Sequence, residues 1–321
     1  MPLAIDLSTL LPTPSPTNTT TYQTKFRRLR FVVIILNQII EQLAALPNCM
    51  DLRVPEDDNL PFTVCGDVHG QFYDLLNIFA VNGEPSDERP YLFNGDFVDR
   101  GSFSLEVILT LFAYKLVTPK GVNLSRGNHE SKNMNKIYGF EGEVKHKLDM
   151  DIARLFTVAF CNLPLCATIE SKIFVVHGGL ASENGVRIAD INRLDRVREP
   201  PECGLMCDLL WSDPQPMPGR SPSKRGIGLS FGPDVTDDFL ETNGLDLVVR
   251  SHEVRDEGFE WEHGNRLVTV FSAPNYCDQM GNKGAFLHFK RNDGLTPNFL
   301  QFTHVPHPPI RPMQYASALM Q

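Results

Sequence analysis

The chain has 321 residues, of which 42% are hydrophobic and 21% are charged, and this balance is typical of a globular protein with a sizeable core. The formal net charge of -9 argues against a protein that binds nucleic acid through a broadly basic surface. No apolar run approaches the roughly 20 residues of a membrane span, so we expect no membrane partner.

The seven cysteines are an odd number and lack the spacing of a disulfide framework. Cys203 and Cys207 are the closest pair, and no second pair repeats their spacing as a structural zinc site would require. We therefore expect reduced thiols, which are typical of proteins in the cytoplasm or the nucleus.

The start of the chain is rich in Thr, Pro and Ser and has little to bury, so residues 1–24 are expected to be a disordered low-complexity segment. Four basic residues follow between positions 25 and 30, and with the segment before them they faintly resemble a targeting sequence. Residues 25–48 are expected to form an N-terminal helix that packs on the main domain; an independent partner-binding helix is the alternative. The helical spacing that predicts it is carried by Ile35, Ile39, Leu43 and Leu46.

From residue 62 onward, short apolar runs alternate with longer mixed segments, of which Tyr73–Phe79 and Ser104–Tyr114 are helical candidates. Such short runs are typical of buried strands. The alternation predicts one α/β domain with layered sheets and helices over residues 49–321. The predicted strands are Phe62–Cys65, Tyr91–Phe93, Val122–Leu124, Ile173–Val176, Leu245–Val249 and Leu267–Phe271.

Five of these strands are followed by glycine-flanked or polar turns that carry Asp, Asn or His. Ligands bind beyond the carboxyl ends of strands in open α/β sheets, where such turns converge. Carboxylate, amide and imidazole groups without a thiolate suit Mn, Fe or Zn, and six of them fit two ions bridged by one carboxylate better than a single ion. A purely structural role is the alternative for any one of these residues, but five turns together favour a metal site. The candidates are Asp67, His69, Asp96, Asn128, His177 and His252.

The turns read Gly-Asp-Val-His-Gly, Gly-Asp-Phe-Val-Asp-Arg-Gly, Arg-Gly-Asn-His-Glu, His-Gly-Gly and Ser-His-Glu. In this order they resemble the phosphoprotein phosphatase family of calcineurin-like metallophosphoesterases, and residues 210–214 and 272–277 do so too. The resemblance covers residues 50–320 and is strongest to the type-5 serine/threonine branch. It implies a metallophosphatase catalytic domain built as a layered sandwich. Two mixed β-sheets would be flanked by helices, with the metal site at the C-terminal ends of the strands.

The resemblance also implies roles for the site residues. Asp67 and His69 would hold the first of two divalent metal ions, which would be Mn, or Fe and Zn. Asp96 would bridge both ions, and the second ion would be held by Asn128, His177 and His252. The substrate phosphate would face Arg100, Arg225, Asn128 and His129, with Tyr276 on a flanking loop.

The implied activity is hydrolysis of phosphoserine and phosphothreonine in proteins, by direct attack of a hydroxide held between the two ions. His129 is not needed as a ligand, because Asn128 fills that role, and we assign it as the general acid that protonates the leaving oxygen. Asp99 would accept a hydrogen bond from the other ring nitrogen and keep His129 charged. The alternatives are an Asp99 that only ties down Arg100, and an Arg225 that is merely a solvated loop residue.

The expected partners are phosphoprotein substrates, with regulatory or targeting proteins as further candidates and no nucleic acid. A phosphodiesterase or nuclease on the same fold is the competing hypothesis, although the acidic chain disfavours a nuclease. A non-catalytic interaction module would lack ligands, and none is missing here. The type-5 branch carries an N-terminal tetratricopeptide-repeat domain, for which the roughly 60 residues before the first motif leave no room. We therefore expect that domain to be absent and do not carry over chaperone binding.

Overall fold

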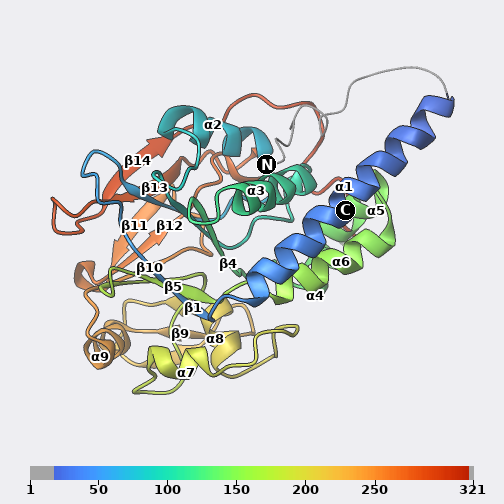
Figure 1. Ribbon diagram of the computed structural model, residues 1–321. Helices are drawn as coiled ribbons and strands as arrows, with labels where there is room; N and C mark the ends of the chain where they lie inside the picture. Colours follow the sequence, from blue (N-terminus) through green and yellow to red (C-terminus); the bar gives the residue numbers. More distant parts are fainter. Residues whose placement is uncertain (1–17, 318–321) are drawn as a thin grey trace.

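The computed structural model describes residues 18–317, and it describes side chains from residue 29 onward. Two mixed β-sheets stack on one another, and helices cover their outer faces (Figure 1). The predicted α/β sandwich of two mixed sheets flanked by helices is therefore confirmed.

One sheet has five strands in the order β14-β13-β2-β3-β4. Three of its strands are parallel, namely β2 (Phe62–Cys65), β3 (Tyr91–Asn94) and β4 (Val122–Ser125). The sequence predicted all three within one residue at each end. The hairpin of β13 (Gly284–Phe289) and β14 (Asn298–Phe302), which was not predicted, extends the sheet beyond β2. In it β13 runs antiparallel to β2, and β14 runs antiparallel to β13.

The other sheet has six strands in the order β1-β5-β6-β10-β12-β11. At its centre β6, β10 and β12 are parallel, whereas β5 and β11 run antiparallel to their inner neighbours. The strands are β1 (Cys49–Leu52), β5 (Cys166–Ile169), β6 (Ile173–Val176), β10 (Leu247–Arg250), β11 (Phe259–Glu262) and β12 (Leu267–Val270).

The prediction for β10 began two residues too early, because a helix cap occupies that place. Gly244 ends helix α9 (Pro233–Asn243) with a φ of 66°, a conformation that glycine adopts without steric cost. The Leu245 amide then donates to Leu240 O across 2.9 Å, which closes the C-terminal turn of the helix. Leu245 thus belongs to the cap, and the strand starts at Leu247.

The inner faces of the two sheets form a shared apolar core. Val64 and Leu92 of the five-stranded sheet cluster there with Val175, Val249 and Val268 of the six-stranded sheet. The outer face of each sheet has its own apolar cluster beneath the helices, so the central strands are buried on both sides. Burial on both sides explains why these strands are continuous apolar runs without polar alternation.

Helices cover both outer faces, and a small third sheet, β7-β9-β8, lies on the six-stranded side. The helices on the five-stranded side are α1 (Asn18–Ala44), α2 (Phe72–Asn82), α3 (Ser104–Val117), α4 (Lys132–Tyr138), α5 (Phe140–Lys147) and α6 (Met150–Cys161). On the other side, with α9, are α7 (Ile188–Asn192), α8 (Leu205–Trp211) and the strands β7 (Asp213–Pro214), β8 (Arg220–Pro222) and β9 (Leu229–Phe231).

Helix α1 packs against α3 and α6 (Figure 1). Its buried side chains include Ile35, Ile39 and Leu43. The predicted packing helix therefore exists, but it ends at Ala44 and begins at Asn18. Residues 18–24, which we expected in the disordered segment, belong to the helix, because a formed helix extends at little further cost per residue. Residues 1–17 lie outside the described part of the chain. Between residues 18 and 317 no helix combines the length and the apolarity needed to cross a bilayer.

Candidate metal centre and phosphate site

The six predicted metal ligands meet at one edge of the sandwich, and all six side chains are buried. Asp96 lies at the centre of the group. Its Oδ2 atom is 3.4 Å from Nε2 of His69 and 3.3 Å from Nε2 of His177. Nε2 of His69 is also 3.6 Å from Oδ2 of Asp67. A carboxylate that faces ligands on both sides occupies the position that a bridge between two ions requires.

His177 shows why the second half of the group fits a cation. Its Nδ1 must donate to the main-chain oxygen of Asn94, 2.8 Å away, because a carbonyl only accepts. Nε2 therefore faces Oδ1 of Asn128 at 2.9 Å, Nδ1 of His252 at 3.2 Å, and the Asp96 carboxylate. Each of these atoms can offer a lone pair, so either a ring proton or a metal ion must lie among them.

The charges of the site also favour bound cations. Burial raises the pKa of Asp67 to about 7, and the charge of Asp96 adds to this effect. Burial would raise the pKa of Asp96 as well, but the charges of His177 and His129 hold it well below its usual range. Burial lowers the pKa of His69 to about 3 and holds that of His252 well below its usual range. Both rings are therefore neutral imidazoles, the form that binds metals.

Two groups of side chains have ligand atoms that lie within 4.8 Å of one another, one with His69, Asp96 and His129, the other with Asp96, His177 and His252. In addition, Nε2 of His252 is buried and makes no hydrogen bond. The donor set is oxygen and nitrogen only, which matches the chemistry of Mn, Fe or Zn. The residues present therefore fit a pair of divalent ions.

The turns that carry these ligands are conformationally unusual. His69, Asp96, Asp99, Arg100 and His252 all have positive φ, between 45° and 71°, although none is glycine. Such residues cost energy and cluster at functional sites, where surrounding contacts hold them. The conformation turns the chain sharply within these segments, and the side chains of His69, Asp96, Arg100 and His252 line the same cavity.

Glu130 holds two of these turns together, and the sequence reasoning assigned it no role. Its carboxylate accepts hydrogen bonds of 2.8 Å from the amides of Asp96, Phe97 and Gly127. The turns are packed so closely that a Cβ atom on Gly127 would lie 2.2 Å from Oδ1 of Asp96. Only the position of Glu130 beside His129 in the Arg-Gly-Asn-His-Glu turn could have drawn attention to it.

His129 and Asp99 form the predicted pair. Nδ1 of His129 donates to Oδ2 of Asp99 across 2.8 Å, and both side chains are buried. Asp99 also accepts from the side-chain amide of Asn135 at 3.0 Å and from the amide of Phe140 at 2.9 Å. Burial would lower the pKa of His129, but the charges of Asp96 and Asp99 raise it above its usual value. This direction of the shift favours the protonated ring. Asn135 was not anticipated, because its role depends on the start of helix α4.

The two predicted phosphate-binding arginines line one cavity together with four of the six predicted metal ligands. The Arg100 guanidinium lies over the Tyr138 ring, 3.7 Å from its centroid, and its buried Nε has no hydrogen-bond partner. Arg225 is held by Asp213, whose carboxylate lies 2.7 Å from Nε, so it is not simply a solvated loop residue. The cavity has a volume of about 300 Å³ and is lined by Asp67, His69, Asp96, Arg100, His129, Arg225, His252, Glu253, Val254, Phe271 and Tyr276.

Three of the predicted site residues, namely Asn128, His177 and Asp99, lie behind this cavity and do not line it. Asn128 turns its side-chain oxygen to His177, which suits a metal ligand better than the direct phosphate contact we also expected. Asp99 lies behind His129 and reaches the cavity only through that ring. Tyr276, in contrast, lines the cavity, and its ring centroid is 5.2 Å from that of His69.

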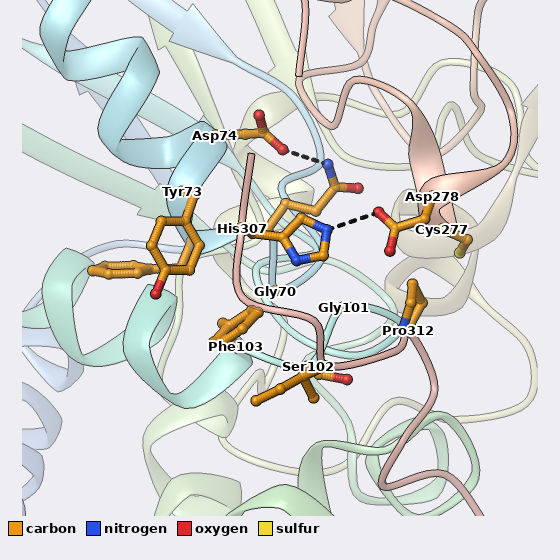
Figure 2. Close-up of a pocket in the computed structure, with 13 residues that line it drawn as sticks. Gly70, Tyr73, Asp74, Gly101, Ser102, Phe103, Cys277, Asp278, His307 and Pro312 are labelled. Carbon is orange, nitrogen blue, oxygen red and sulfur yellow. Dashed lines mark hydrogen bonds and ion pairs between the residues drawn. The ribbon is translucent and has the colours of Figure 1, made fainter. Parts of the chain in front are cut away.

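A smaller cavity of about 30 Å³ lies beside the first, against Gly70, Gly101 and Cys277 (Figure 2). Its polar side chains pair with one another. His307 lies 3.1 Å from a carboxylate oxygen of Asp278, and Gln71 donates to Asp74 across 2.8 Å (Figure 2). Because these groups are already paired, we assign no ligand to the smaller cavity.

Comparison with known proteins agrees with this geometry. A model of the calcineurin-like phosphoesterase family matches residues 60–256. Serine/threonine-protein phosphatase 5 of Solanum lycopersicum is 64% identical over 292 residues, which are 91% of this chain and 52% of that protein. The Homo sapiens protein of the same name is 58% identical over 287 residues, which cover 89% of this chain and 57% of that protein. The chain thus spans little more than half the length of these curated relatives.

A solved structure provides a third comparison. A protein serine/threonine phosphatase from Saccharomyces cerevisiae, described as similar to human phosphatase PP5, superposes with a TM-score of 0.85 at 43% identity. The match covers 89% of this chain and 93% of that one. Family match, sequence identity and superposition agree, and the chain belongs to the calcineurin-like phosphoesterase family.

Proposed function

We propose that this chain is a serine/threonine protein phosphatase that hydrolyses phosphoserine and phosphothreonine in other proteins. The observation that carries the proposal is that a ligand set for two ions, two arginines and a carboxylate-bound histidine gather around one cavity. Each of these three features addresses one difficulty of phosphate monoester hydrolysis, which is among the slowest uncatalysed reactions known. The names of the relatives in tomato and human support the same activity.

The metal ions would be held by Asp67 and His69 on one side and by Asn128, His177 and His252 on the other, with Asp96 shared. When bound, a pair of Mn ions, or of Fe and Zn, would neutralise phosphate charge and activate a water as the nucleophile for direct attack on phosphorus. Direct attack requires no side-chain nucleophile.

The substrate phosphate would be bound by Arg100 and Arg225. Both are planar forked donors that match phosphate oxygens, and the Nε of Arg100 is a buried donor without a partner among the described residues. Arg225 is positioned through Asp213, which also accepts from the fully buried Arg250 at 2.9 Å. Charge that spreads over the phosphate oxygens in the transition state would thus meet donors already in place.

His129 would protonate the oxygen of the departing serine or threonine. Its Nδ1 is occupied by Asp99, so Nε2 is the atom left to give a proton into the cavity. An alkoxide is a poor leaving group, and general acid catalysis of this kind contributes about 10²–10⁴-fold. The Asp99 carboxylate is fixed by Asn135 and Phe140, and it keeps the ring in one orientation throughout.

Phosphopeptide hydrolysis by the metal-stripped chain, with each metal added back, tests this proposal. We expect no turnover without metal, and turnover of a phosphoserine peptide with Mn or with Fe and Zn. Bis(4-nitrophenyl) phosphate, a diester, is the comparison substrate for the competing phosphodiesterase hypothesis. A higher kcat/KM for the diester than for the phosphopeptide would replace the proposed function by that alternative. We also propose that the protein is located in the cytoplasm or the nucleus and that it binds targeting proteins.

A further inference from the structure

We propose that Asn94 is a positioning residue that holds the ligands of the second metal ion in place. The inference rests on the proposed metal centre and goes beyond its ligand set. Asn94 is the last residue of β3, its side chain is fully buried, and it stands two residues before Asp96.

The side-chain amide of Asn94 reaches both sheets. Its Nδ2 donates to the main-chain oxygen of Val176 across 2.8 Å and to the hydroxyl of Ser251 across 2.9 Å. Val176 and Ser251 directly precede His177 and His252 in the chain. One amide group of the five-stranded sheet therefore fixes the points at which two ligand-bearing turns leave the six-stranded sheet.

The remaining atoms of Asn94 complete the connection. Oδ1 accepts from the hydroxyl of Ser125 across 2.9 Å, and Ser125 ends the strand that leads to Asn128. The main-chain oxygen accepts from Nδ1 of His177. This last contact sets the ring tautomer, so that Nε2 faces the metal position, and such outer contacts orient ligands and tune metal affinity.

The chemistry of these contacts requires an amide. The oxygen of Val176 can only accept a hydrogen bond, so the Asn94 side chain must turn its NH₂ group there and its oxygen toward Ser125. An aspartate would put an oxygen against the Val176 oxygen. A leucine of similar size would remove the side-chain hydrogen bond to the buried Val176 oxygen and supply no donor in its place. Either substitution would allow the two ligand-bearing turns to move away from the positions in which the ligand atoms meet.

Any buried asparagine can contribute to stability, so a control variant has to separate an effect on stability from an effect on metal binding. Asn82 is that control. It is also buried, and it donates to Thr63 at 3.0 Å and to Tyr91 at 2.6 Å. Both partners lie at the beginning of their strands, at the opposite end from the ligand-bearing turns.

The experiment compares Asn94→Leu with Asn82→Leu in the full chain. Titration calorimetry with manganese should show that Asn94→Leu lowers the affinity for one of the two ions by about 10–100-fold. Asn82→Leu should bind both ions with the affinities of the unchanged chain. Urea unfolding should show similar losses of stability for the two variants. Nitrogen-15 NMR should show a shifted Nδ1–H signal of His177 in Asn94→Leu only, and excess manganese should restore turnover. Asn94→Ser, which keeps one hydroxyl in place of the amide, provides a milder second variant and should show a smaller loss of affinity.

The other outcomes of this experiment would overturn either the positioning role of Asn94 or the proposed metal centre. Unchanged affinity for both ions in Asn94→Leu, or in Asn94→Ser where the leucine variant fails to fold, overturns the positioning role and leaves the proposed function standing. An unchanged chain that binds fewer than two ions overturns the proposed metal centre, and this inference with it. Equal weakening in Asn82→Leu and Asn94→Leu shows a general loss of stability and also overturns the positioning role.

Discussion

Replacing Asp96 by asparagine should leave the chain with at most one firmly bound metal ion and lower kcat by about 10³-fold or more. The Asp96 carboxylate faces His69 on one side and His177 on the other, at 3.4 and 3.3 Å. Both imidazoles face the same oxygen, Oδ2, whereas Oδ1 accepts from the amide of His129. The NH₂ group of an asparagine would therefore point either at both imidazoles or at the N–H of His129. The variant would lose both the shared ligand and a negative charge, and a loss of about 4 kcal/mol in transition-state stabilisation corresponds to that fold-change.

Metal analysis by mass spectrometry after gel filtration, together with phosphopeptide kinetics, checks this expectation. Asp74→Asn is the matched control, because Asp74 is a buried aspartate held by Gln71 and by the amide of Val305 beside the smaller cavity. It should retain two ions and normal turnover. Two ions bound to Asp96→Asn with the affinity of the unchanged chain would refute the bridging role.

Replacing His129 by asparagine should have the second large effect, and the effect should depend on the leaving group. Hydrolysis of a phosphoserine peptide should slow by about 10²–10⁴-fold, because the alkoxide needs the proton that His129 supplies. Hydrolysis of 4-nitrophenyl phosphate should slow far less, because that phenolate leaves without protonation. The measurement is kcat for a series of substrates whose leaving-group pKa rises from phenols to alcohols.

His307→Asn is the matched control for this series. His307 also pairs with an aspartate, Asp278 at 3.1 Å, but it lies in the smaller cavity beside the site (Figure 2). His307→Asn should change kcat only slightly, and by the same factor for all substrates of the series. An equal loss on alkyl and aryl phosphates in His129→Asn would remove the assignment of His129 as the acid and leave the metal centre untouched.

The elements of the fold that could be predicted are those whose structure follows from the pattern of neighbouring residues in the sequence. β2 and β6 were predicted to the residue, because strands buried on both faces are uninterrupted apolar runs. β1, β5 and the hairpin of β13 and β14 were not predicted. β1 pairs with β5, which lies far along the chain, and no local pattern of residues reveals such a pairing.

The residues of the candidate site also fall into those that the local sequence pattern predicts and those that it does not. The six ligands could be predicted because parallel strands end at the same edge, so polar turns that follow them converge. Asn94 could not, because its partners Val176 and Ser251 are 82 and 157 residues away and nothing in a lone asparagine points to them. Arg225 was placed only by resemblance, since the contact to Asp213 that positions it depends on how the small third sheet folds.

The account as a whole depends on Asp67, His69, Asp96, Asn128, His177 and His252 enclosing a pair of cations. Diffraction from crystals of the manganese-loaded chain, recorded at the manganese absorption edge, tests this most directly. We predict two anomalous peaks about 3.5–4 Å apart, with the Asp96 carboxylate bound to both. A single peak, or a second peak without Asp96 among its ligands, would contradict the account.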